Sequence, residues 1–136
     1  MDPETYVQHF IGYTFRHRGY IKEAVDWKHN ERLALLGDTV VALLLLEDWY
    51  RSQRGCGAGS QIMKRYASNR AMAYEARTAG FDEHIRPSSL HMFHSPAYDH
   101  VLATEVEAIV AAVWLDSERN FAVTKSCYQR IKNAHA

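Results

Sequence analysis

The chain has 136 residues, of which 47% are hydrophobic and 24% are charged, enough for one globular domain and too apolar for intrinsic disorder. Sixteen Lys and Arg residues balance sixteen Asp and Glu residues, so the formal net charge is zero. This balance disfavours a protein that coats polyanions through a general basic surplus, and any contact with nucleic acid must come from a local basic patch.

The first two predicted helices, residues 5–11 and 19–27, are short and amphipathic. Their apolar side chains recur at the three- and four-residue spacing of one helix face. A long helix, Glu31–Arg51, follows, and Asn30 is predicted to be its N-cap. The middle of this helix is apolar nearly all round, which predicts that protein surrounds it on most sides.

Further helices are predicted at residues 60–66, 69–79, 98–115 and 120–132, each from the same helical spacing. The segment 52–60, SQRGCGAGS, is rich in turn-forming residues and is predicted to be a connection. The few clusters of β-branched residues lie within helical spacing, so we expect no strand. The predicted fold class is all-α, with six to seven helices in a single domain that spans residues 1–136.

Cysteine usage and the N-terminal sequence favour an intracellular protein. Cys56 and Cys127 are too few for a disulfide-rich scaffold, and two free thiols in a reducing compartment is the simpler interpretation. The acidic N-terminus lacks the features of a secretory signal, and the longest apolar run, residues 40–46, is far shorter than a membrane span. We therefore expect a location in the cytoplasm, with mitochondria as the alternative, and no contact with a membrane.

Two acidic residues occur in apolar helical surroundings. Asp38 lies in one of the most apolar stretches of the chain, where a carboxylate is costly unless it is paired, hydrogen-bonded or bound to a metal. Glu107 has small residues on its own helix face, which let another helix approach closely. Two such carboxylates meeting between helices would suit Mg²⁺ or Mn²⁺. The structural alternative is that Asp38, which follows a glycine, is an N-cap at a kink or pairs with an arginine.

Four blocks of the sequence, in the same order, resemble the ribonuclease III family. Residues 29–41, HNERLALLGDTVV, resemble the family signature HNERLEFLGDAVL. Residues 11–25, 68–86 and 103–116 resemble the family's other blocks, LGYTF…LL..AL, SNETLA…GLDKYIR and ADVFEALIGAIYLD. The resemblance implies an endoribonuclease that cleaves double-stranded RNA to 5′-phosphate and 3′-hydroxyl ends. It also implies that Asp38 and Glu107 are the catalytic residues and bind Mg²⁺, for which Mn²⁺ can substitute.

Two of the four carboxylates usual in that family are missing. Ala34 stands where a Glu is usual and Thr104 stands where an Asp is usual, while Glu105 is one residue off and would point about 100° away on a helix. The bacterial Mini-III ribonucleases have a similar pattern and cleave double-stranded RNA with the remaining Asp and Glu. Outside these sites, the first block resembles ordinary ribonuclease III more than Mini-III.

The missing carboxylates leave three interpretations open. One is an active enzyme with weak metal affinity, which needs high Mg²⁺ or prefers Mn²⁺. The second is a catalytically inert RNA-binding or scaffold protein, as in ribonuclease III-like proteins of mitochondrial ribosomes. The third is an inert partner that completes an active heterodimer. The retained pair, Asp38 and Glu107, favours the first interpretation, because a scaffold needs neither acid.

The resemblance also implies partners. It implies a homodimer that pairs through the helix Glu31–Arg51, which would cover apolar side chains that a small monomer cannot easily bury. Glu31 and Thr104 are accessory candidates at the active site. Four polar residues lie where family members approach RNA, and phosphate contacts there compete with the alternative of an ordinary solvated helix face: Lys64, Arg65, Asn69 and Arg70. No double-stranded-RNA-binding domain is expected within the 136 residues.

Overall fold

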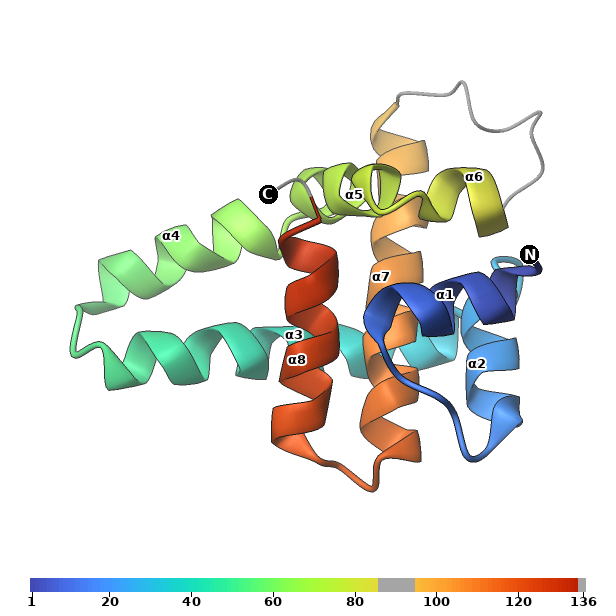
Figure 1. Ribbon diagram of the computed structural model, residues 1–136. Helices are drawn as coiled ribbons and strands as arrows, with labels where there is room; N and C mark the ends of the chain where they lie inside the picture. The colour runs from blue at the N-terminus through green and yellow to red at the C-terminus, as the bar shows by residue number, and fades with distance from the viewer. Residues whose placement is uncertain (86–94, 135–136) are drawn as a thin grey trace.

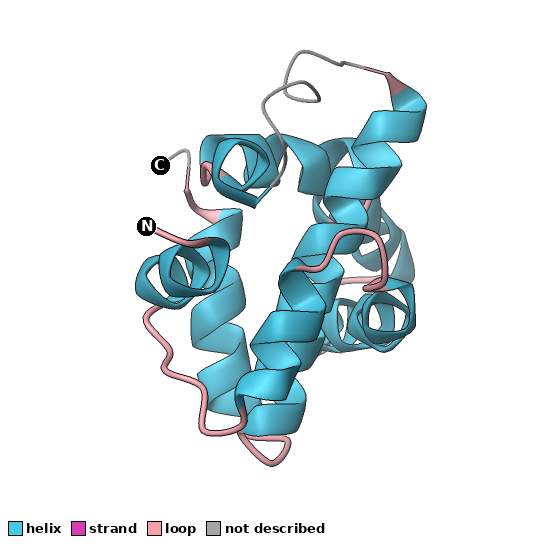
Figure 2. Cartoon of the chain, turned by 90° about the vertical axis from the view of Figure 1, so that its right-hand side faces the viewer, coloured by secondary structure: helices cyan, strands magenta, loops and turns pink. Residues whose placement is uncertain are grey.

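The computed structural model describes residues 1–85 and 95–134, which form eight α-helices and no strand (Figures 1 and 2). In chain order they are α1 (Pro3–Ile11), α2 (Arg18–Val25), α3 (Glu31–Arg51), α4 (Cys56–Tyr66), α5 (Asn69–Thr78), α6 (Phe81–Ile85), α7 (Pro96–Asp116) and α8 (Phe121–Lys132). The predicted all-α class is confirmed, and each predicted helix is present. No helix in these residues is long and apolar enough to cross a membrane.

Two elements differ from the prediction. The helix α6 has five residues, too few for a hydrophobic spacing to show in the sequence. The helix α4 begins at Cys56, inside the glycine-rich segment that predicted a connection. At Gly59, an added Cβ would lie 2.9 Å from the Trp49 ring of α3, so only a glycine allows α4 to pack this closely on α3. This packing outweighs the low helix propensity of glycine.

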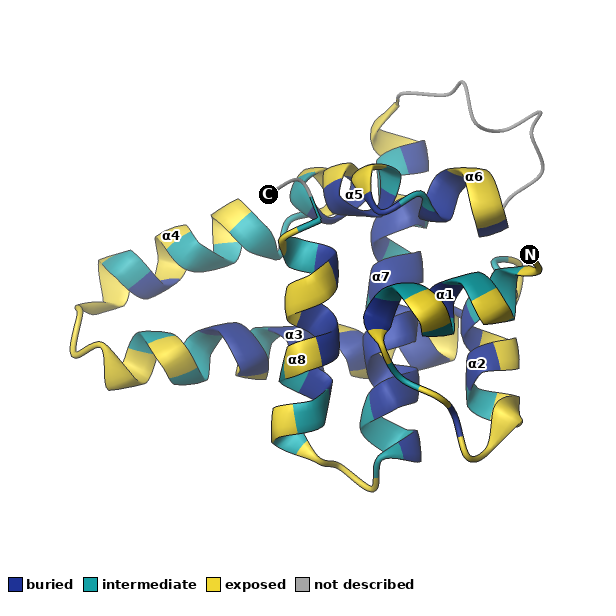
Figure 3. Ribbon diagram, in the orientation of Figure 1, coloured by how far each residue is buried: buried dark blue, intermediate teal, exposed yellow. Residues whose placement is uncertain are grey.

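The helix α7 forms the centre of the molecule. Figure 3 shows it dark blue over most of its length, with α2, α3, α5 and α8 packed around it. Its apolar residues are buried on several faces; Val106, Ile109 and Val113 are fully inaccessible to solvent. A helix that is apolar nearly all round needs such an enclosed position.

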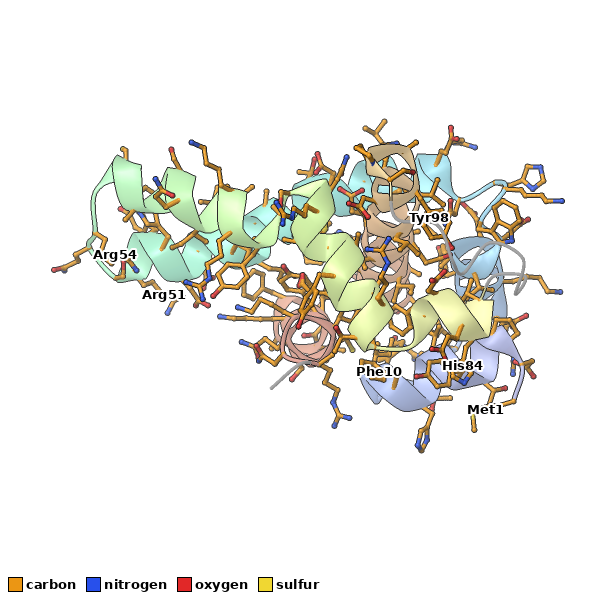
Figure 4. The ribbon with its side chains drawn as sticks, turned by 90° about the horizontal axis from the view of Figure 1, so that it is seen from above. Met1, Phe10, Arg51, Arg54, His84 and Tyr98 are labelled. Carbon is orange, nitrogen blue, oxygen red and sulfur yellow. The ribbon has the colours of Figure 1, made fainter. Side chains whose placement is uncertain are left out.

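The helix α3, by contrast, is covered on one side only. Val40 and Leu44 are buried against the body of the molecule, whereas Leu35 is 76% exposed and Leu43 is 47% exposed. The prediction that protein surrounds this helix on most sides is therefore wrong for a single chain. Together α3 and α4 form an arm, with Arg51 and Arg54 at its far end (Figures 1 and 4).

Asn30 precedes α3 but its side chain does not cap the helix, so that part of the prediction is wrong. The residue is buried, and its Nδ2 group donates to the Ala24 carbonyl at 3.1 Å and to the Glu105 carboxylate at 3.3 Å. A buried carboxylate without a donor is costly, so the amide is better used on Glu105 than on the helix end. Asn30 thus connects α2 and α7 at the start of α3.

A second buried acid holds the segment between α1 and α2. The Asp116 carboxylate accepts hydrogen bonds from the Tyr13 hydroxyl at 2.7 Å and from the backbone N–H groups of Arg16 and His17 at 3.0 and 2.8 Å. Burial acts to raise the pKa of Asp116, but these hydrogen bonds outweigh it, so the pKa is lowered. Asp116 is therefore a structural acid with its acceptor positions filled.

Gly37 allows the backbones of α3 and α7 to approach each other very closely. A Cβ added at Gly37 would lie 1.8 Å from the backbone carbonyl oxygen of Glu107. No side chain fits in that space, and the atom it would meet belongs to a helix backbone that cannot move alone. Gly37 therefore fixes how closely α3 packs on the central helix.

We expect Gly37→Ala to destabilise the fold by about 3 kcal/mol or more, because the methyl group forces the two backbones apart. Urea unfolding monitored by circular dichroism measures this change. Gly19→Ala in α2 is the matched control, since a Cβ there meets nothing within 4 Å. The control should gain about 0.5–1 kcal/mol from the helix preference of alanine. Equal stabilities for Gly37→Ala and the wild type would contradict the close packing described here.

Candidate active site

Asp38 of α3 and Glu107 of α7 lie together at the helix crossing. Their side chains are joined by a hydrogen bond, although they are 69 positions apart in the sequence. Asp38 is exposed and Glu107 is partly buried, so the pair opens onto the surface. Within the described residues, neither carboxylate forms a salt bridge. The alternatives of an N-cap at a kink and of an arginine partner therefore do not apply to Asp38, which lies inside the continuous helix α3.

Glu107 holds its proton more tightly than an isolated glutamate does. Burial, followed by the hydrogen bond with Asp38 and its negative charge, raises the pKa of Glu107 from 4.5 to about 8. The protonated Glu107 carboxyl donates to the Asp38 carboxylate, which relieves the repulsion between the two acids. A divalent cation between the same oxygens would relieve that repulsion as well.

Few other ligand groups surround the pair. Ala34, one turn before Asp38, is buried and offers no oxygen from its side chain. Thr104, one turn before Glu107, is partly exposed, and its hydroxyl donates to the His100 carbonyl at 2.8 Å. The described residues contain no group of three His, Cys, Asp or Glu side chains that could hold a metal. The donor set is thus two carboxylates, with the lone pairs of the Thr104 hydroxyl beside them on α7.

Two other acids near the motif are not brought to the pair. Glu31 is exposed at the first position of α3, two helical turns before Asp38. Glu105 is fully buried and accepts from Asn30, so its side chain is directed away from the face of α7 that carries Glu107. Glu105 is therefore not a substitute for the missing acid at position 104.

The four residues considered for RNA contact lie at the junction of α4 and α5, and all are exposed. Lys64, Arg65 and Arg70 line a hollow of about 450 Å³. Asn69 Nδ2 lies 3.3 Å from His100 Nδ1, which places Asn69 against α7, one turn before Thr104. The junction is thus connected to the helix that carries Glu107, and its cations form a local patch on a chain with no net charge.

Two residues that shape these sites were missed by sequence reasoning. Gly37 entered the sequence-based prediction only as the residue before Asp38, and its contact with α7 was not predicted. A glycine within an apolar helical run often has a packing role, which was the available signal. Glu75 of α5 is buried, and its position three residues after Met72 on the apolar face of the helix was the available signal.

Comparisons with known proteins agree with this geometry. Residues 12–133 match the family model described as ribonuclease-III-like. Ribonuclease 3 of Idiomarina loihiensis is 28% identical over 125 residues, covering 85% of this chain and 54% of the relative. Ribonuclease 3 of Xylella fastidiosa is 33% identical over 122 residues, covering 82% of this chain and 52% of the relative. The chain thus spans about half the length of these curated relatives.

The fold matches a solved structure. The nuclease domain of ribonuclease III from Campylobacter jejuni superimposes with a TM-score of 0.75 at 20% sequence identity, over 94% of both chains. A second crystal structure of the same domain gives a TM-score of 0.74 at 19% identity. The helical architecture is therefore that of a ribonuclease III nuclease domain.

We expect Asp38→Asn to lower the pKa of Glu107 from about 8, because the variant removes a negative charge and supplies an amide donor. The pKa should stay above 4.5, since burial is the largest cause of the shift. Titration of the Glu107 side-chain carboxyl ¹³C resonance measures it. In the wild type, the folded state holds this proton more tightly than the unfolded chain, so stability falls between pH 4.5 and 8.

Asp48→Asn is the control for that titration, because Asp48 lies on the same helix and pairs with Lys125 rather than with Glu107. The pKa of Glu107 should not change in this variant. An unchanged pKa in Asp38→Asn would instead show that the two acids do not interact.

Proposed function

The chain belongs to the ribonuclease-III-like family, and on that premise we propose that it is a divalent-metal-dependent endoribonuclease that cleaves double-stranded RNA as a homodimer. The observation that carries this proposal is the contact between Asp38 and Glu107 at the surface. A scaffold gains nothing from two acids that repel each other, whereas a nuclease needs such a pair.

The donor set fits a hard divalent cation such as Mg²⁺ or Mn²⁺. Both ligands are carboxylates, their oxygens already lie close enough to share a proton, and the pair is open to solvent. Asp38 and Glu107 would hold the ion, and Thr104 and Glu31 remain accessory candidates. When bound, the ion supplies positive charge against the scissile phosphate and activates a water molecule for in-line attack.

The residues of the chain have distinct parts in this function. Glu107 gives up its proton when the site is loaded, because both carboxylates must then be ionised. Lys64, Arg65, Asn69 and Arg70 position the RNA through its phosphates, which sets register without reading sequence. The products carry 5′-phosphate and 3′-hydroxyl ends.

The reduced acid set resembles the pattern of the Mini-III ribonucleases. With Ala34 and Thr104 in place of two acids, the site carries two fewer negative charges, so its affinity for a divalent ion is lower. We therefore propose that activity needs millimolar Mg²⁺ or prefers Mn²⁺.

The stripe of exposed apolar side chains on α3 supports the homodimer. Leu36, Leu43 and Tyr50 recur every seven residues on one side of the helix, and they are 37%, 47% and 76% exposed. Such a stripe is costly in water and is suited to pairing with a second copy. The Campylobacter jejuni nuclease domain is described as flexible in a region involved in dimer formation, and we extend dimer formation to this chain.

The test of the catalytic proposal is cleavage of long double-stranded RNA in Mg²⁺ or Mn²⁺. We expect the wild type to cut, and Asp38→Asn and Glu107→Gln to lose about 100-fold or more in rate, because each removes one of two ion ligands. Asp48→Asn should retain full activity. A wild type that binds RNA without cutting it would favour the inert scaffold, and equal cleavage by all four proteins would indicate a contaminating nuclease.

The homodimer is tested by sedimentation velocity. The wild type should sediment at twice the mass of the chain, and Leu43→Glu at the mass of one chain, because the charge would be buried at the centre of the apolar stripe. Tyr74→Glu serves as the control, since Tyr74 is 56% exposed on α5 and lies outside the stripe. If both variants remain dimeric, α3 is not the interface.

A further inference from the structure

The helices α4 and α5 and the end of α8 come together at the base of the arm (Figure 1). Residues of these three segments line a hollow of about 450 Å³. Four cationic side chains line it, Lys64, Arg65, Arg70 and Lys132, and Glu75 is its one acidic residue. In a chain whose formal net charge is zero, this concentration of positive charge is local. It predicts an anionic ligand such as a phosphate group.

Glu75 is the unusual feature of this hollow. The side chain is 3% exposed, and both carboxylate oxygens lack a hydrogen-bond partner within the described part of the chain. Burial raises the pKa of Glu75 to about 7 against the opposing effect of Lys132, whose positive charge lowers it. The other buried acids in the described residues are Asp82, Glu105 and Asp116, and each accepts a hydrogen bond. Glu75 therefore differs from them, and its buried carboxylate without donors needs an explanation.

The cations on the wall are held near an aromatic ring. Lys132 Nζ lies 4.6 Å from the centroid of the Tyr66 ring, and the Arg65 guanidinium lies 5.4 Å from it. Tyr66 and Lys132 also line a second hollow, of about 430 Å³, whose other lining residues come mainly from α3, α4 and α8. Positive charge and aromatic surface together are the surroundings that nucleotide phosphates and bases favour.

We propose that this hollow binds a guanine nucleotide, with its phosphate on Lys64 and Arg70 and its base edge on the Glu75 carboxylate. Guanine alone among the four RNA bases presents two adjacent N–H donors, at N1 and N2, on its Watson–Crick edge. A carboxylate has two acceptor oxygens and no donor when ionised, so it matches that edge with both oxygens. Adenine, cytosine and uracil each set an acceptor beside their donor, and the carboxylate repels it.

Access to Glu75 requires a movement. Both oxygens are closed off from solvent, so a base reaches them only when a side chain of the wall swings aside. Lys132 and Arg70 have long, flexible side chains and line the hollow. Binding favours such a movement, because the base supplies the hydrogen-bond donors that the buried carboxylate lacks.

The guanine can come from a free nucleotide or from an unpaired residue of RNA. Neither source needs Asp38 or Glu107, so the failure of this inference leaves the proposed cleavage by that pair untouched. The two proposals share only the phosphate contacts of Lys64 and Arg70, whereas the guanine contact of Glu75 belongs to this inference alone.

The test is a binding titration followed by NMR at pH 8, where Glu75 is mostly ionised. The probes are 5′-GMP, 5′-AMP and inorganic phosphate. We expect 5′-GMP to bind about tenfold or more tightly than 5′-AMP, and phosphate to bind more weakly than either. Glu75→Gln should reduce 5′-GMP to the affinity of 5′-AMP. The same substitution at Glu83, an exposed acid on α6, is the matched control and should change nothing.

We expect the Glu75→Gln variant to fold, so a loss of binding would not result from unfolding. Glutamine stays neutral, so Glu75→Gln avoids the burial of a charge and should be at least as stable as the wild type, which thermal unfolding checks. Lys64→Gln with Arg70→Gln should weaken all three probes alike. The proposal is overturned if no nucleotide binds, or if 5′-GMP and 5′-AMP bind equally and Glu75→Gln has no effect, which would leave a basic patch for phosphates only.

A last comparison separates the two sources. A short RNA duplex with one unpaired 3′-guanosine is compared with the same duplex made blunt, in the wild type and in Glu75→Gln. A preference for the overhang that Glu75→Gln removes supports RNA as the source of the guanine. Binding of 5′-GMP without such a preference supports a free nucleotide.

Discussion

At Gly37, the backbones of α3 and α7 are in direct contact. The carbonyl of Glu107 occupies the space that a side chain at position 37 would need. The helices are therefore closest at this point, and the next residue on α3, Asp38, is brought to Glu107. The same contact leaves the side of α3 that carries Leu43 uncovered. One close approach thus sets both the acid pair and the apolar stripe.

The acids of this protein differ in what neutralises them, and that difference separates structure from function. Asp116 has three hydrogen-bond donors, and Glu105 accepts from Asn30, so both are parts of the fold. Glu107 has another acid as its neighbour and keeps a proton at neutral pH. Glu75 has no donor among the described residues. We propose ligands for these acids: a metal ion for Glu107 together with Asp38, and a guanine base for Glu75.

Hydrophobic spacing was sufficient to predict the long helices, because each of them buries apolar residues that recur at the helical period in the sequence. The meeting of Asp38 with Glu107 was predictable from the family resemblance and from the small residues around Glu107; their catalytic role stays a prediction. The Asn30 side chain donates to groups of α2 and α7, which come together only in the folded chain. The general preference of Asn for capping helices therefore predicted the wrong partner for this side chain. The start of α4 depends on the packing of Gly59 against Trp49. This is a tertiary contact, so the helix propensities of the residues around Gly59 could not predict it.

The alanine at position 34 and the threonine at position 104 have a consequence for the approach of a polyanion. Two acids at those positions would add negative potential to a surface that we propose faces phosphates, and this chain has no overall basic charge to offset it. With the smaller set of acids, the mouth of the site repels an incoming strand less. In the function that we propose, a lower affinity for the metal ion is thus coupled to a faster encounter with RNA, and the balance between the two shifts with ionic strength.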